Sequence, residues 1–461
     1  MRRIARSSLF VVLLAGCASP VKYERPPVEL PAAWKETAPR FAEEGRWWRI
    51  YDDAHLDALV AEAFRGNGDL VVAVARVDEA RGLLAEAESF LFPRLDAQGS
   101  ASRQQISQRS ATSFPGVARE FSSYRATLNL SYEVDLFGRL RSGTEAARAE
   151  LAASEASREA VRLALAAQVV KSYFDLRSLD EQVLLTRQSL ALREDLLSLQ
   201  RKRYRAGMIG DFELRQLEAE AAAARAQLPG LEEAREREEA ALAVLLGRTP
   251  REAFEAGIEV KGQYGERLQA PVVPAGMPSE LLLRRPDLVE AERRLAAANA
   301  RVAVARSEMF PSIALTAVLG SESAALSNLF SGPAGLWTVA AAATQPIFSG
   351  GRTEARTAAA EARERAALAQ YQQAVRAAFG EVRTALVSQS RARERFDAES
   401  ERAQALQETL RLARLRYENG IASQIEVIDA ERGLLAARIA RVDALRAHRS
   451  AVADLFRALG G

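Results

Sequence analysis

The stretch YRATLNLSYEVD, from Tyr124 to Asp135, alternates between two kinds of side chain. Its even-numbered residues are Tyr, Ala, Leu, Leu, Tyr and Val, and its odd-numbered residues are Arg, Thr, Asn, Ser, Glu and Asp. This two-residue period predicts a β-strand with one apolar face and one polar face. Tyr124 and Tyr132 would lie about 26 Å apart at roughly 3.3 Å per residue, which is typical of the aromatic-edged apolar band of an outer-membrane barrel. A sheet that covers a soluble core would alternate in the same way, so both interpretations stay open.

The polar face of this strand is expected to line a barrel lumen through Arg125, Asn129, Glu133 and Asp135. Three further strands, with weaker alternation, are predicted at 95–105, 312–322 and 336–345. Four strands cannot close a barrel, because the smallest barrels have eight. After the first sixteen residues, no apolar run approaches the roughly 20 residues of a membrane helix. A membrane-spanning form would therefore need two, three or four copies that share one barrel.

The two halves of the chain carry the same features at constant offsets. The Phe-Pro pair at 92–93 recurs at 310–311, an offset of 218 positions, and Gly207 recurs as Gly420, an offset of 213 positions. Constant offsets through helix and turn favour an internal duplication over chance. Each half is expected to hold a helix, a β-hairpin and a long helical hairpin.

Two segments predict unusually long helices. Residues 144–206 contain neither Gly nor Pro, and these 63 residues would extend about 95 Å at 1.5 Å per residue. Residues 352–419 contain no Pro and one glycine, Gly380. Apolar residues recur at steps of seven along both segments, which predicts packing against neighbouring helices over most of their length. A solvated coiled-coil stalk is the alternative, and the predicted strands argue against it.

Each long helix is expected to end at a Tyr-x-x-Gly turn. The first turn is RYRAGMIG, which ends at Gly210, and the second is RYENGIAS. Gly207 and Gly420 can adopt the positive φ of a helix C-cap. Asp211 and Ser423 are expected to be the N-caps of the return helices, because Asp and Ser are common N-cap residues.

The N-terminal stretch MRRIARSSLFVVLLAG, residues 1–16, has three arginines, no acid and an apolar core, which predicts a secretory signal peptide. The only cysteine, Cys17, follows directly, as in a bacterial lipobox, and we expect it to carry a covalent lipid. Ala18 and Ser19 come next, which resembles lipoproteins sorted to the outer membrane rather than kept at the inner one. A free cysteine inside a signal peptide is the alternative.

The balance of charge and the scarcity of metal-binding side chains argue against nucleic-acid binding, metal binding and catalysis. Lys and Arg total 63 and Asp and Glu total 61, so no field suited to nucleic acid is expected. His55 and His448 are the only histidines and lie far apart, and the four methionines are scattered. This pattern predicts no metal site, no catalytic constellation and no cofactor other than the lipid. We therefore do not expect an enzyme.

Three longer segments carry a family resemblance. They are RWWRIYDDAHLDALVAEAFRGNGDLVVAVARVDEAR at 46–81, LLRRPDLVEAERRLAAANARVAVARSEMFPSIALTA at 282–317 and QPIFSGGR at 345–352. These segments resemble the TolC-type outer membrane factors, specifically the lipoprotein branch with OprM and NodT. The resemblance implies a mainly α, mixed α/β membrane protein that forms a homotrimer. Each protomer would give four strands to a twelve-stranded outer-membrane barrel, which continues into a long periplasmic α-helical barrel.

The resemblance also implies a function and a location. Such proteins are lipid-anchored and span the outer membrane, with a large periplasmic part. They are passive exit ducts for small molecules, such as drugs or other toxic compounds, in tripartite efflux pumps. A periplasmic adaptor (membrane fusion protein) and an inner-membrane transporter, often of the resistance-nodulation-division (RND) type, would be the partners. An outer-membrane channel for type I protein secretion is an alternative, and a poreless lipid-anchored periplasmic adaptor is a third interpretation.

A gate at the periplasmic turns is a further implication of the resemblance. Ile425 and Asp429 match the residues that narrow the tunnel in OprM-like relatives, and Phe212 and Gln216 stand at the equivalent positions of the first half. Three copies of Asp429 would form a ring that repels anions and attracts cations. An Asp on an exposed helix face is the alternative. The turn residues expected to contact the adaptor are Tyr204, Gly207, Gly210, Tyr417 and Gly420. For the two tyrosines, a packing role alone also remains open.

The expected organisation is a signal peptide at 1–16, a lipidated arm at 17–53, a first repeat at 54–252, an equatorial linker at 253–280 and a second repeat at 281–461. In the first repeat, the β-hairpin is expected at 94–135 and the helical hairpin at 138–247. In the second repeat, the corresponding hairpins are expected at 311–346 and 351–459.

Overall fold

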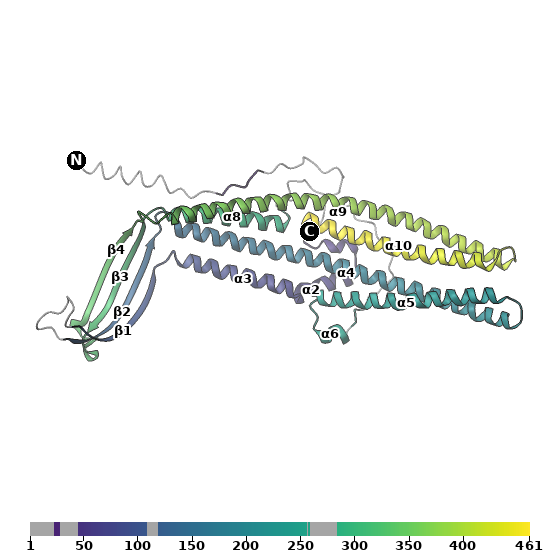
Figure 1. Ribbon diagram of the computed structural model, residues 1–461, viewed down its shortest axis with the longest axis horizontal. Coiled ribbons are helices and arrows are strands. Elements are labelled where there is room, and N and C mark those ends of the chain that lie inside the picture. Colours follow the sequence, from purple (N-terminus) through teal and green to yellow (C-terminus); the bar gives the residue numbers. More distant parts are fainter. Residues whose placement is uncertain (1–22, 28–44, 108–118, 256, 259–283) are drawn as a thin grey trace. The chain divides into compact units, whose positions relative to one another are not determined.

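The computed structural model describes residues 23–27, 45–107, 119–255, 257–258 and 284–461. Within them the chain is mainly helical and has one four-stranded sheet (Figure 1). The helices are η1 (Trp47–Tyr51), α2 (Ala54–Gly66), α3 (Gly68–Ser89), α4 (Arg139–Arg205), α5 (Asp211–Leu245), α6 (Pro250–Glu255), α8 (Pro286–Ser307), η3 (Leu326–Asn328), η4 (Gly332–Ala334), α9 (Arg352–Glu418) and α10 (Gln424–Leu459). The strands are β1 (Arg94–Gln105), β2 (Glu120–Val134), β3 (Ser312–Ser323) and β4 (Gly335–Thr344).

The chain divides into two compact units. The strand unit comprises Met1–Pro27, Arg76–Glu155 and Glu290–Gln372, and it holds the sheet with the adjoining parts of α3, α4, α8 and α9. The helical unit comprises Val28–Ala75, Ala156–Val289 and Gln373–Gly461, and it holds α2, α5, α10 and the remaining parts of α4 and α9. Both predicted turns belong to the helical unit.

The four strands form one antiparallel sheet in the order β1-β2-β3-β4. All four predicted strands are confirmed, with ends that differ by a few residues. Strand β2 ends at Val134, one residue earlier than predicted. The reason is that the Asp135 carboxylate accepts the backbone N–H of Arg141 at 2.9 Å and so caps the start of α4. Asp135 therefore lies beyond the strand that was expected to present it.

The registers place the side chains of all four strands on two distinct faces. Leu128 of β2 lies opposite Ala97 of β1 and Leu319 of β3. Leu319 in turn lies opposite Trp337 of β4. Directly opposed residues share a face, so the even-numbered residues of β2 and the odd-numbered residues of the other strands form one apolar face. This face is exposed, with Trp337 at 75% and Val339 at 73%, whereas a sheet that covers a soluble core would bury it.

The two long helices are confirmed. Helices α4 and α9 each run for 67 residues without a break. Helix α4 begins at Arg139, earlier than predicted, and Gly380 lies inside α9 without interrupting it. No helix in the described ranges has a stretch long and apolar enough to cross a lipid bilayer.

Elements of the two halves begin at the predicted offsets. Helices α3 and α8 have 22 residues each, strands β1 and β3 have 12 each, and both pairs start 218 positions apart. Helices α4 and α9 start 213 positions apart. Gly138 and Gly351, directly before these helices, both have positive φ, 77° and 81°.

The core of the helical unit includes the aromatic side chains of η1. Trp47 stacks on Phe456 of α10 with ring centroids 4.9 Å apart. Tyr51 packs edge-on against Phe174 of α4 at 4.8 Å, and its hydroxyl donates to the Arg449 carbonyl at 2.8 Å. These contacts pack η1 against α4 and α10 of the helical unit.

The Arg-Arg-Pro-Asp segment at 284–287 fastens three helices of the same unit. Arg285 has only 8% of its side chain exposed, and its guanidinium forks onto the Asp287 carboxylate at 3.0 and 2.6 Å. Its Nη2 also donates to Glu381 of α9 at 2.8 Å, and its Nη1 donates to the Ala458 carbonyl of α10 at 3.1 Å. A planar, always charged guanidinium suits such a site. The segment is therefore a structural clamp between α8, α9 and α10.

Candidate gate at the helical turns

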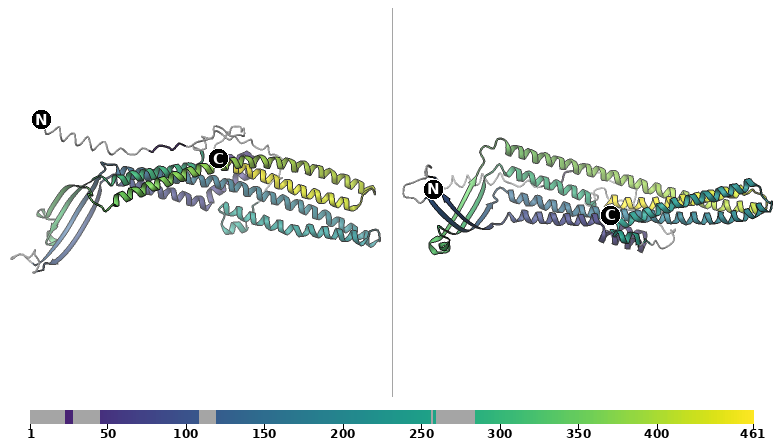
Figure 2. Two further views of the ribbon diagram at one scale, coloured as in Figure 1. Left: turned by 45° about the horizontal axis from the view of Figure 1, so that its top comes forward. Right: turned by 60° about the horizontal axis from the view of Figure 1, so that its bottom comes forward.

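Both helical hairpins reverse direction through the same type of turn. Gly207 and Gly420 lie in the left-handed region with φ of 73° and 71°. In the first turn the N–H of Met208 donates to the Arg203 carbonyl at 2.9 Å, and the equivalent bond in the second turn is also 2.9 Å long. This bond across a left-handed glycine defines the Schellman motif, which confirms the two predicted C-caps. The two turns lie at the same end of the helical unit (Figures 1 and 2).

The return helices begin differently from each other. Ser423 is the N-cap of α10, as predicted, and the Glu426 carboxylate accepts its backbone N–H at 3.4 Å. The prediction for Asp211 was wrong, because Gly210 is the N-cap of α5 and Asp211 is its first helical residue. Gly210 has an extended backbone, with φ −81° and ψ 171°, which ends the turn one residue earlier than a cap at Asp211 requires. In the first turn of the helix, the negative charge of Asp211 still stabilises α5, because it lies at the positive end of the helix dipole.

An apolar cluster packs α10 against the first helical hairpin near the turns. It consists of Leu197 of α4, Leu214, Leu217 and Ala221 of α5, and Ile428 of α10. Beside it, the Nε2 of buried Gln200 donates to the Oε1 of Gln424 at 3.3 Å. Three of the four long helices therefore meet in one core at this level.

The predicted gate residues flank this core on the helix surfaces. Phe212 is 69% exposed, Ile425 is 42% exposed, and Asp429 has 62% of its side chain exposed. Gln216 is half-buried. Each helix carries its two candidates four residues apart, so they share one face of that helix. Within the described protomer, Asp429 pairs with Arg432 of its own helix at 3.5 Å.

A charged network that the sequence analysis missed lies beside Asp429. Glu220 of α5 has 7% of its side chain exposed, and its carboxylate accepts the Nε of Arg432 at 2.9 Å. Arg193 of α4 lies 3.3 Å from the same carboxylate and donates to the Glu220 carbonyl at 3.1 Å. We call Arg193, Glu220, Arg432 and Asp429 the turn network. It links three helices to the carboxylate of the candidate gate.

Burial has the largest effect on the pKa of one member of this network, Arg193. It lowers the pKa of the Arg193 guanidinium, which the nearby Glu431 carboxylate opposes and Arg432 reinforces. Glu220 stands next to the buried position of Ala221. The only sign of the network in the sequence was an acidic residue next to the apolar residues Leu214, Leu217 and Ala221 of the same helix.

The two turn tyrosines have different surroundings. Tyr417 is half-buried, and its hydroxyl accepts the Nη1 of Arg203 at 3.4 Å, which links α9 to α4. Tyr204 is 40% exposed. The equivalence of these residues in the sequence therefore does not extend to their contacts.

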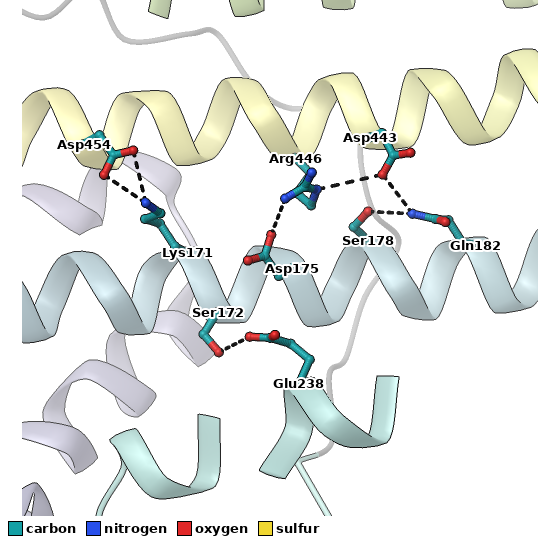
Figure 3. A network of polar contacts seen from close by, with 9 residues as sticks. All are labelled: Lys171, Ser172, Asp175, Ser178, Gln182, Glu238, Asp443, Arg446 and Asp454. Carbon is teal, nitrogen blue, oxygen red and sulfur yellow. Dashed lines mark hydrogen bonds and ion pairs between the residues drawn. The ribbon is translucent and has the colours of Figure 1, made fainter. Parts of the chain in front are cut away.

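Further along the helices, polar contacts hold α10 and α5 on α4 (Figure 3). Lys171 pairs with Asp454 at 3.0 Å, and Arg446 pairs with Asp175 at 2.8 Å. From α4 towards α5, the Ser172 hydroxyl donates to the Glu238 carboxylate. These contacts fix the helices against one another at a greater distance from the turns than the apolar cluster.

The predicted lumen residues within β2 all lie on the polar face of the sheet. Asn129 donates to Gln98 of β1 at 3.3 Å, and Arg125 lies 3.9 Å from Glu322 of β3. Glu133 accepts a bidentate fork from Arg139 at 2.9 and 2.6 Å. In the described ranges no group of three or more His, Cys, Asp and Glu side chains is arranged to hold a metal ion. Cys17, the predicted lipid site, lies outside the described residues.

A sheet with one exposed apolar face, together with long helical hairpins, defines a class of outer-membrane channel. The sequence matches the outer membrane efflux protein family over residues 59–248 and 277–461. It is 35% identical over 466 residues to the outer membrane protein OprJ of Pseudomonas aeruginosa, across 99% of this chain and 95% of that protein. It is 31% identical over 468 residues to the probable outer membrane lipoprotein SilC of Salmonella typhimurium, across 100% and 98%. The crystal structure of the Campylobacter jejuni CmeC outer membrane channel has a TM-score of 0.89 and 26% identity, and covers 96% of this chain and 94% of that one.

The chain belongs to the family of outer membrane efflux proteins. Its place is the outer membrane and its activity is efflux, which confirms the predicted family and function. The family consists of channel proteins rather than enzymes. Protein secretion and a poreless adaptor, the two alternatives, are not the functions for which these relatives are named.

Proposed function

We propose that three copies of this chain form one duct through the outer membrane, with four strands from each protomer in a twelve-stranded barrel. The sheet carries this proposal, because its apolar face is exposed and its edge strands β1 and β4 have no second strand beside them among the described residues. An edge strand presents unpaired N–H and C=O groups, and lipid cannot satisfy them. Joining three copies pairs all edges. Three copies, rather than two or four, follow from the resemblance to TolC-type factors.

In this assembly the apolar face meets lipid and the polar face lines the lumen, with Arg125, Asn129 and Glu133 among its side chains. The helical hairpins of the three copies continue the duct into the periplasm. Matching element bounds at offsets of 218 and 213 positions support an internal duplication of the chain. Each copy would then supply two similar sectors to the duct.

The gate of the duct is formed at the helical turns. Asp429 of each copy contributes to a carboxylate ring, with Ile425, Phe212 and Gln216 as the surrounding barrier. The exposure of Phe212 and Ile425 in one protomer, 69% and 42%, fits side chains that other copies cover. Arg432 lies 3.5 Å from Asp429 and offsets part of the negative charge of the ring. Passage is therefore limited both by this charge and by the apolar side chains of Phe212 and Ile425.

The partners are a periplasmic adaptor and an inner-membrane transporter, most simply of the RND type. The adaptor contacts the turns near Gly207, Gly210 and Gly420, and parts the helices that carry Tyr204 and Tyr417. Cys17 carries the lipid that anchors the chain, which the description of SilC as a lipoprotein supports. Other relatives are named for antibiotic efflux and cation efflux, and we take the cargo to be small toxic molecules that the transporter selects.

Two arginine substitutions at neighbouring positions of β4 test the proposal. Val339 lies on the apolar face and Thr338 on the opposite face. Val339→Arg is expected to block assembly in the outer membrane, because arginine in the hydrocarbon core of a barrel costs about 2–4 kcal/mol. Thr338→Arg would point into the lumen and assemble. The readouts are trimers in outer-membrane fractions and drug export in a strain without its own efflux channel, and equal assembly of both variants would contradict the proposal.

A further inference from the structure

The sheet contains an internal seam, which we define as the pairing of β2 with β3. This seam joins the last strand of the first hairpin to the first strand of the second hairpin. In it, Tyr124 lies opposite Ser323, Leu128 opposite Leu319 and Val134 opposite Ile313. The proposed barrel needs a second kind of seam, where β4 of one copy meets β1 of the next.

Positions in the two hairpins correspond one to one. Strands β1 and β3 have 12 residues each, and their first residues, Arg94 and Ser312, are 218 positions apart. Their partners in the two hairpins are Ser131 and Thr344, which are 213 positions apart. Neither hairpin has an insertion relative to the other within these strands, so β1 is the counterpart of β3, and β2 is the counterpart of β4.

We propose that neighbouring copies meet in the register of the internal seam, so that Ala341 of one copy lies opposite Ala101 of the next. This inference rests on the proposed trimer. It follows from the internal pair of Leu128 and Leu319, since Ala341 is the counterpart of Leu128 in β4 and Ala101 is the counterpart of Leu319 in β1. The same shift places Ala342 opposite Ser100.

Side-chain size supports this register independently. Strand β4 carries a run of four alanines, Ala340–Ala343, and β1 carries four small residues, Gly99–Ser102. Both runs are exposed in the described protomer. The proposed register sets the two runs opposite each other over their whole length, from Ala340 and Ser102 to Ala343 and Gly99. Small side chains on both sides fit opposite one another without steric conflict at the usual strand spacing of about 4.8 Å, whereas a slip of two residues would match only half of the runs.

The two faces of the sheet support the register as well. Odd-numbered residues of β4 would oppose odd-numbered residues of β1, and both sets belong to the apolar face. A slip of one residue would place the apolar face of one copy beside the polar face of the next. The proposed register therefore gives a continuous apolar surface around the barrel.

Disulfide cross-linking between copies tests the register. Ala341→Cys combined with Ala101→Cys is expected to yield covalent trimers after oxidation, because opposed residues fall within the Cα separation that a disulfide needs. Ala342→Cys combined with Ser100→Cys repeats the test on the other face, in case one pair has unsuitable geometry. The matched controls combine Ala341→Cys with Gly99→Cys or with Arg103→Cys. These partners are displaced by about 7 Å along the strand, so they should cross-link at least about tenfold more slowly.

Four outcomes decide the matter. Rapid cross-linking of the opposed pairs, reversed by reductant on denaturing gels, supports the register. Faster cross-linking through Gly99→Cys or Arg103→Cys would overturn the register but not the trimer. The register would also be overturned if native mass spectrometry shows intact trimers and none of the cysteine pairs forms a cross-link. Loss of trimers in the unsubstituted protein would instead overturn the proposed function, and the register with it.

Discussion

The Nε of Arg432 in α10 donates to the carboxylate of Glu220 in α5 at 2.9 Å, across 212 positions of the chain. Glu220 and Arg193 have only 7% and 10% of their side chains exposed. A buried charge costs free energy unless it is paired, so these residues depend on one another. The second helical hairpin is thus tied to the first by a buried charge beside the candidate gate.

Replacing Glu220 should loosen the turns. Glu220→Gln leaves the buried Arg193 without its carboxylate, and breaking a buried pair in this way costs on the order of 3–5 kcal/mol. We expect a lower midpoint of thermal unfolding and a several-fold higher single-channel conductance. The matched control is Glu233→Gln in the same helix, where the partner Arg237 is 74% exposed and the pair contributes little. Equal changes in the two variants would show that the turn network has no special role.

Alanine substitutions at two glycines of the second hairpin should have opposite effects. Gly420 needs a φ of 71° at the turn, and a residue with a Cβ in the left-handed region costs about 1–2 kcal/mol. Gly380 lies inside α9, where an added Cβ would meet open space, and alanine in a helix interior gains roughly 0.5–1 kcal/mol. Gly420→Ala should therefore lower the unfolding midpoint in circular dichroism, and Gly380→Ala should raise it slightly. A loss of the same size at both positions would argue against the left-handed cap.

The free energy of unfolding of the helical unit should fall in mild acid, because the buried side chain of His448 is then protonated more readily in the unfolded chain. This side chain is 4% exposed, and burial lowers its pKa below 6.5; Arg393 and Arg449 add to this effect and Asp397 opposes it. The unfolded chain therefore binds a proton more readily, so the stabilisation is fully present above a pH of about 6.5 and is lost as the pH falls through the lowered pKa. His448→Gln should reduce the fall in unfolding midpoint between pH of about 7.5 and 5.5. An unaltered pH dependence in this variant would exclude His448 as the source.

The features predicted best from the sequence are those with a local physical cause. The alternation in Tyr124–Asp135 and the absence of Gly and Pro from 144–206 depend only on neighbouring residues, and both elements formed as expected. Gly207 and Gly420 were predictable because only glycine adopts positive φ at little cost. The constant offsets between the halves also carried over to the bounds of the helices and strands.

Features that depend on packing between distant segments were not predictable. The pairing of Glu220 with Arg432 requires knowing how the two hairpins pack, since neither residue belongs to a recognisable motif. Gly210 rather than Asp211 is the N-cap because the extended backbone at the end of the turn falls on Gly210. The local sequence does not fix this position to within one residue. The different surroundings of Tyr204 and Tyr417 arise because only the second reaches Arg203 of the other hairpin.

The gated duct is tested most directly by the single-channel conductance of the purified protein in a planar bilayer, wild type against Asp429→Ala. The matched control is Asp211→Ala, since the two carboxyl side chains are 62% and 61% exposed and each lies close to a turn. We predict a low wild-type conductance that rises several-fold in Asp429→Ala and stays unchanged in Asp211→Ala, because the proposed constriction contains Asp429 and not Asp211. A conductance that is as low in Asp429→Ala as in the wild type would contradict a gate at this residue.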